Sequence, residues 1–162
     1  MPDARRNQRE PIGNMRLDAH RILVPVNGEP VSERTFRWAC RLAKEAKAEL
    51  HALFVIEVPL ALPLEAESSE AVSDGEEILA RIEAIGAEEK YKGLQANFLR
   101  ARHAGPAIVM EAEDRVMDLM ILGIPYRRRF GASTLGPTAT YVLQNAACEV
   151  LFWRDSAATT LT

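Results

Sequence analysis

The sequence predicts an α/β fold, namely a five-stranded parallel sheet that is doubly wound into an open α/β sandwich with about four helices. Short apolar runs of strand length, such as 21–26 (RILVPV), alternate along the chain with segments of helical periodicity, such as 30–47. The strand runs are hydrophobic throughout, which is typical of strands buried on both faces of a parallel sheet. The strand–helix order then requires right-handed crossovers, with helices on both faces.

The first strand, 21–26, is followed by Asn27 and Gly28, and helical periodicity extends from about Pro30 to Lys47. The helix positions that recur at spacings of three and four should form its apolar face. They are Val31, Thr35, Trp38, Leu42 and Ala46.

The middle of the chain predicts two further strands around a second helix. The second strand is expected over 49–58, and a third, at a sheet edge, over 94–102. The segment 59–73 carries two prolines and several acidic residues, which indicates a mobile loop. The second helix is expected over 74–92, with Ile78, Ile82 and Ile85 on one face.

The last part of the chain predicts two helices and two strands. Pro106 suits the first turn of a third helix, and a fourth strand over 117–122 ends at Gly123. Pro137 begins a fourth helix, whose expected apolar face is Ala139, Val142, Leu143 and Ala146. The fifth strand is Cys148–Trp153, which is apolar on both alternating sides.

Length and composition indicate one domain of an ordinary globular protein, with 162 residues that are 48% hydrophobic and 27% charged. Residues 1–19 are expected to be a disordered arm because they are too polar to form a core. The domain covers 20–155, and 156–162 form a polar tail.

Charge and cysteine content exclude several classes of function. A net charge of −3 provides no basic surface for nucleic acid, and no apolar run is long enough to span a membrane. Two cysteines are too few for a disulfide framework, so we expect Cys40 and Cys148 to be buried thiols of a reduced, cytoplasmic protein. The three histidines are scattered, which argues against a metal site.

The candidate site lies where ligands bind in such sheets, beyond the carboxyl ends of the strands. Asn27 and Gly123 each follow a strand, so we expect them to line one cleft. The loop from Gly123 to Thr138 runs into a helix N-terminus, where bare N–H groups and the helix dipole favour an anion. The segment resembles a phosphate-binding P-loop in its glycine spacing, but Pro137 stands where that motif requires lysine.

The loop, the VPVNG that ends the first strand and the strand–helix order resemble the universal stress protein family over residues 21–154. That family commonly dimerises and divides into members that bind ATP and members that do not. The ATP-binding motif is glycine, two residues, glycine, nine residues, glycine, then serine or threonine. Gly123 and Gly136 match its first and third glycines, whereas Tyr126 replaces the second and Pro137 replaces the hydroxyl residue.

The resemblance also implies that Pro25, Val26 and Val55 surround the adenine and ribose. Asn27 stands where the ATP-binding members usually have aspartate. It retains an acceptor for a ribose hydroxyl and loses the charge.

The two departures from the motif predict weak phosphate binding. Tyr126 brings a ring where backbone should approach phosphate, and Pro137 has no N–H to donate. Two lost bonds to an anion, each worth roughly 1.5–3 kcal/mol, weaken binding about a hundredfold or more. Alternatively, Tyr126 is a loop aromatic that covers the pocket. Arg127 and the two arginines after it either replace the lost contacts or form a solvated loop, and Thr138 is either a phosphate donor or an ordinary first-turn residue.

Two functions follow from these features. The first is a non-enzymatic stress-response or regulatory module that binds ATP or another adenine nucleotide weakly. The second is a dimeric protein-interaction domain with a vestigial pocket that binds no nucleotide. An ATP-hydrolysing enzyme is disfavoured because the loops offer no general base. Since the strand Cys148–Trp153 should lie at an exposed sheet edge, we expect a homodimer through it.

Overall fold

The structure, a computed structural model, describes residues 17–157 apart from residues 67, 130, 131 and 134. Five parallel strands form one sheet in the order β3-β2-β1-β4-β7, and β5 and β6 form a separate antiparallel hairpin. The strands are β1 (Arg21–Val26), β2 (Glu49–Glu57), β3 (Gln95–Ala101), β4 (Leu119–Ile124), β5 (Arg128–Arg129), β6 (Ala132–Ser133) and β7 (Glu149–Arg154). The helices are α1 (Pro30–Ala46), α2 (Ser69–Glu88), α3 (Ala104–Asp114) and α4 (Pro137–Asn145).

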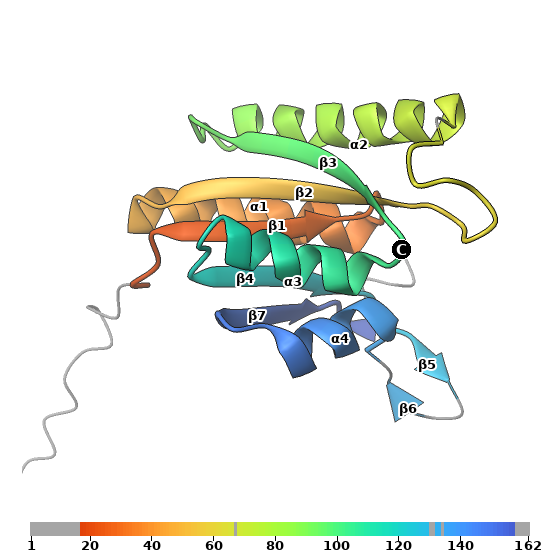
Figure 1. Ribbon diagram of the computed structural model, residues 1–162. Coiled ribbons are helices and arrows are strands. Elements are labelled where there is room, and N and C mark those ends of the chain that lie inside the picture. The colour runs from red at the N-terminus through yellow and green to blue at the C-terminus, as the bar shows by residue number, and fades with distance from the viewer. Residues whose placement is uncertain (1–16, 67, 130–131, 134, 158–162) are drawn as a thin grey trace, which may run out of the picture.

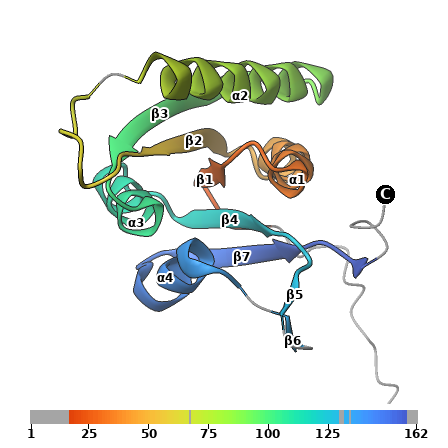
Figure 2. The same ribbon diagram turned by 90° about the vertical axis from the view of Figure 1, so that its right-hand side faces the viewer.

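Helices cover both faces of the sheet, with α1 and α2 on one face and α3 and α4 on the other (Figures 1 and 2). Successive residues of the central strand β1 enter opposite cores, since Ile22 and Val24 pack with α1 and α2 while Leu23 packs with α3 and α4. The predicted fold class is therefore confirmed, and so is the edge position of β3.

Helix α1 buries a face slightly different from the one that its periodicity predicts. Val31 and Thr35 are buried as expected, but Trp38 is 44% exposed, and Phe36 and Cys40 fill the core in its place. The ring of Trp38 instead packs against Trp153 of β7, with 4.9 Å between ring centroids. The hydrophobic wheel misplaces Trp38 because this partner lies far away in the sequence.

Helix α2 begins at Ser69, so the predicted loop over 59–73 is too long. Ser68 caps the helix by accepting a hydrogen bond from the N–H of Ala71 at 3.3 Å. Arg102 binds the first part of the remaining loop. Its guanidinium donates hydrogen bonds to the carbonyl oxygens of Val58, Pro59 and Leu62 at 3.2, 2.7 and 2.8 Å.

Three further expectations require correction. Strand β4 continues to Ile124, so Gly123 lies inside the strand and not after it. Leu143 of α4 is 57% exposed and does not share the buried face of Ala139 and Val142. The arm predicted for residues 1–19 is too long, because Ala19 is buried in the core. Residues 1–16 and 158–162, most of the predicted arm and tail, lie outside the described residues.

The cysteines are unpaired and only one is fully buried. Cys40 lies in the core, where burial raises the pKa of its thiol to about 12. Cys148 is half-buried, and burial raises its pKa as well. Within the described part of the chain, no helix combines the length and the apolar character that a membrane crossing requires.

Candidate functional site

A cavity of about 200 Å³ lies at the carboxyl ends of β1, β2 and β4, between the first turns of α3 and α4. This is the end of the sheet at the right of Figure 1. Eight predicted site residues line it: Pro25, Val26, Asn27, Val55, Gly123, Arg127, Gly136 and Thr138. The structure thus brings Asn27 and Gly123 into one cleft, as the order of the strands predicts.

Tyr126 is the predicted site residue that does not line the cavity. The guanidinium carbon of Arg154, at the end of β7, lies 5.2 Å from the centre of its ring, in a cation–π contact. The obstruction expected from Tyr126 therefore has no support in the geometry, and Pro137 remains as the departure that affects the cavity directly.

The turn after β1 is held by its own side chains. The N–H of Asn27 donates to Ser32 Oγ at 3.3 Å, and Asn27 Oδ1 accepts from the N–H of Glu29 at 3.0 Å. Gly28 adopts φ +79°, a left-handed conformation that other residues rarely tolerate. The Asn27 oxygen expected to meet a ribose hydroxyl thus already accepts one bond, and its second lone pair is what a ligand would use.

Gly123 is required by the packing of α1. A Cβ at this position would lie 2.5 Å from Thr35 Oγ1 and 3.0 Å from the carbonyl oxygen of Val31. Thr35, which is fully buried, donates a hydrogen bond to that same carbonyl at 2.7 Å. The glycine therefore allows the first turns of α1 to rest directly on β4, beside the cavity.

The N-terminus of α4 faces the cavity with few donors. Its N-cap is Gly136 at φ 78°, which has no side chain to cap the helix, and Pro137 follows at the first helical position. The N–H groups of Thr138 and Ala139 have no partner within the helix, because the first turn offers no acceptor. Since both residues line the cavity, they are the donors that α4 provides for an anion.

The rim of the cavity carries an ion pair that the sequence did not reveal. Arg127 Nη2 lies 2.7 Å from Glu29 Oε1, and both residues line the cavity. They come from the loops after β1 and β4, 98 positions apart. Arg127 is therefore already paired, and a phosphate that it contacts would lie beside the Glu29 carboxylate. The backbone of Arg128 and Arg129 forms β5.

Sequence reasoning also missed much of the cavity wall. Leu53, Ile108, Leu122 and Ala139 contribute apolar surface from β2, α3, β4 and α4. Leu53 lies two residues before the candidate Val55 on β2, so the two-residue period applied to Val55 would have found it, and Leu122 is the neighbour of the candidate Gly123.

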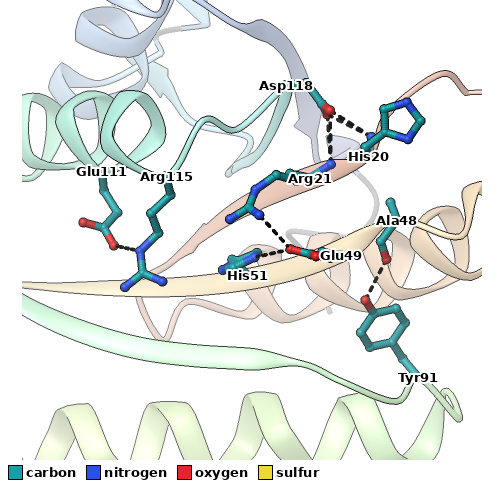
Figure 3. A network of polar contacts seen from close by, with 9 residues as sticks. All are labelled: His20, Arg21, Ala48, Glu49, His51, Tyr91, Glu111, Arg115 and Asp118. Atoms are coloured by element: carbon teal, nitrogen blue, oxygen red, sulfur yellow. Dashed lines mark hydrogen bonds and ion pairs between the residues drawn. The ribbon is translucent and has the colours of Figure 1, made fainter.

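A second polar cluster lies at the opposite, amino end of the strands (Figure 3). Asp118 accepts hydrogen bonds from the backbone N–H groups of His20 and Arg21 at 2.9–3.2 Å, which joins β4 to β1. His51 is buried, so the pKa of its imidazole is lowered, mainly by desolvation; its Nε2 lies 3.5 Å from Glu49.

Among the described residues, no group of three or more histidines, cysteines, aspartates or glutamates could hold a metal ion. The amino-end cluster therefore joins strands, and the carboxyl-end cavity remains the candidate site.

Comparison with known proteins identifies the family of this chain. Residues 19–154 match the model of the universal stress protein family. A curated relative, universal stress protein MJ0531 of Methanocaldococcus jannaschii, is 31% identical, with 81% of this chain and 79% of the relative covered.

Solved structures agree on the fold. A universal stress protein in complex with cAMP is 17% identical at a TM-score of 0.70, with 86% of this chain and 100% of that chain covered. A universal stress protein of Archaeoglobus fulgidus in complex with dAMP is 19% identical at a TM-score of 0.66, with 84% and 98% covered. The family model and the curated relative both match most of the chain, and the sheet has the same fold as these structures. The chain therefore belongs to the universal stress protein family.

Proposed function

We propose that this chain is a non-enzymatic, cytoplasmic stress-response module that binds an adenine nucleotide weakly in the cavity at the carboxyl ends of β1, β2 and β4. The observation that carries the proposal is the convergence of eight predicted site residues on one cavity that also faces the N-terminus of α4. The relatives in complex with cAMP and dAMP support an adenine nucleotide as the ligand class.

The lining divides into parts suited to the parts of such a ligand. Val26, Val55 and Ile108 provide apolar surface for a base. Asn27 offers polar groups to a ribose, and the N–H groups at the start of α4 face a phosphate. Because Pro137 donates no hydrogen bond there, phosphate is held less firmly than at a helix start with all its donors.

The same lining supports a binding role over a catalytic one. Glu29 is the one carboxylate among the described residues that line the cavity, and it is paired with Arg127. A general base needs a free carboxylate or imidazole within reach of the proton that it removes. The family and the two unpaired thiols support the cytoplasmic location.

Isothermal titration with AMP, cyclic AMP and ATP tests the proposal. Thr138→Trp fills the cavity from the start of α4 and should abolish the binding seen with the wild type. Thr140→Trp places the same ring on the same helix, outside the lining, and should leave binding unchanged. Absence of binding by the wild type, or equal binding by both variants, would contradict the proposal.

A dimeric interaction domain is the second candidate, and the outer strand β7 favours it. Leu151 is 45% exposed and Trp153 is 36% exposed on this edge strand, and Trp38 packs against Trp153. Exposed apolar edges are usually covered, because they otherwise promote aggregation. We propose that a second copy of the chain covers β7 in a homodimer.

Light scattering at tens of micromolar tests the homodimer and should give twice the chain mass of 18.0 kDa. Leu151→Lys should shift the protein towards monomer. Leu143→Lys changes a leucine on α4 that is even more exposed, at 57%, and should not. A wild-type monomer would reject the homodimer. A dimer that binds no nucleotide would favour an interaction domain with a vestigial pocket.

A further inference from the structure

The charged side chains of the described lining balance each other before any ligand arrives. Glu29 and Arg127 are the charged side chains among the described residues that line it, and they pair with each other at 2.7 Å. The described part of the lining therefore presents no net positive charge. A phosphate that binds Arg127 therefore also approaches the Glu29 carboxylate, whose negative charge repels it.

The three helix N-termini around the cavity are also poor phosphate sites. At α3, the N–H of Ala104 is already bonded to the carboxylate of Glu57, at 2.9 Å. At α4, Pro137 removes one donor. At α1, the N-cap residue is Glu29 itself, whose negative charge offsets the positive end of the helix dipole.

The position of Glu29 is fixed by its backbone. Its N–H donates to Asn27 Oδ1 at 3.0 Å, and its carbonyl oxygen accepts from the N–H groups of Ser32 and Glu33 at 3.0 and 3.4 Å. Gly28 before it sits in a left-handed turn. The carboxylate can change its rotamer, but the turn holds its Cα at the rim, so it stays near any phosphate that enters.

We infer that Glu29 makes the cavity select against polyphosphates, so that the preferred ligand is an adenine nucleoside or another adenine compound with little charge. This inference rests on the proposed function and specifies its ligand class. The cavity size agrees with a ligand that lacks a phosphate chain. Its volume of about 200 Å³ is below the roughly 300–1,000 Å³ of typical small-molecule sites. Arg127 then acts as the partner that holds Glu29 in place.

Titration calorimetry with adenosine, AMP and ATP against the wild type and Glu29→Gln tests the inference. The wild type should bind adenosine at least as tightly as ATP. Glu29→Gln frees Arg127 and should tighten ATP binding about tenfold or more, equivalent to roughly 1.4 kcal/mol, with AMP between. Adenosine binding should change less than about threefold, because the nucleoside carries no charge.

Glu33→Gln is the matched control. It removes the same charge one turn along α1, from a glutamate that pairs with Arg81 and does not line the cavity. Glu29→Ala gives a second variant without the carboxylate, and circular dichroism checks that both fold.

The outcomes separate the two claims. A wild type that binds ATP about tenfold more tightly than adenosine would refute the inference and leave the proposed function standing. The inference would also be refuted if Glu29→Gln raised the affinity for ATP no more than Glu33→Gln does. Failure of all three ligands to bind either protein would overturn the proposed function, and the inference with it.

Discussion

Replacing Gly123 by alanine adds one methyl group where α1 rests on β4. The new Cβ would lie 2.5 Å from Thr35 Oγ1 and 3.0 Å from the carbonyl oxygen of Val31. The first atom belongs to a stiff, β-branched and fully buried side chain, and the second to the backbone of the helix. Neither can move aside easily, so α1 must shift or Thr35 must leave its rotamer.

The expected cost follows from these two responses. Overpacking a well-packed core by one methyl group costs about 1–3 kcal/mol. If Thr35 rotates, its 2.7 Å bond to Val31 is lost as well, at about 1 kcal/mol. With both responses, we expect Gly123→Ala to lower the free energy of unfolding by roughly 2–4 kcal/mol.

A double-mutant cycle with Thr35→Ala isolates the contact. Removing Oγ1 leaves the contact to Val31 at 3.0 Å, which a shift of a few tenths of an ångström relieves. The double variant should therefore be more stable than the sum of the single effects predicts, by about 1–2 kcal/mol. Urea unfolding at equilibrium measures all three variants.

A second glycine-to-alanine change, in α2, is the control. Gly86→Ala makes the same chemical change inside α2, where the nearest atom to the new Cβ is Leu94 Cδ2 at 3.3 Å, the end of a flexible side chain. Alanine is preferred to glycine in a helix by about 1 kcal/mol, so this variant should be neutral or more stable. Strict additivity of Gly123→Ala and Thr35→Ala would show that the contact with Thr35 Oγ1 is not the source of the cost.

The remaining predictions concern pH. Hydrogen bonds from Arg41 and Arg37 hold the pKa of Glu89 at about 2, below its ordinary 4.5, so its stabilising effect is present above about pH 4.5 and lost as the pH falls towards 2. Urea midpoints should fall less between pH 5 and 3 in Glu89→Gln than in the wild type, and parallel curves would refute this. Burial lowers the pKa of His51 below 6.5, so the unfolded chain binds its proton first and stability falls as the pH drops below about 6.5. His51→Phe should flatten that fall between pH 7 and 5, and an unchanged slope would assign it to other groups.

The fold was predictable because its signals are local. Apolar runs such as 21–26 and helical periods of several turns each report burial within one element. The predictions failed where a contact with a residue far away in the sequence determines the local structure. The wheel placed Trp38 in the core, whereas Trp153 holds it at the surface. The start of α2 was missed because a single capping side chain, Ser68, extends the helix into an acidic, loop-like sequence.

In the candidate site, too, local signals were predictable and contacts between distant residues were not. The strand-end rule located Asn27 and Gly123 because parallel strands end at one edge of the sheet. The direction of Tyr126 depends on Arg154 at the end of another strand, and no spacing within the loop predicts it. The pairing of Glu29 with Arg127 was hidden for the same reason, since the two residues are 98 positions apart in the sequence.

The pair of tryptophans on α1 and β7 also gives the protein a built-in optical reporter. Trp38 and Trp153 are the two tryptophans of the chain, and their rings lie 4.9 Å apart at an interplanar angle of 44°. All indole emission therefore originates from this one surface spot, and its wavelength depends on the water around the two rings. Dilution of the unlabelled protein in a fluorimeter would then reveal whether the β7 edge becomes wetter, because emission moves to the red when a covering surface leaves.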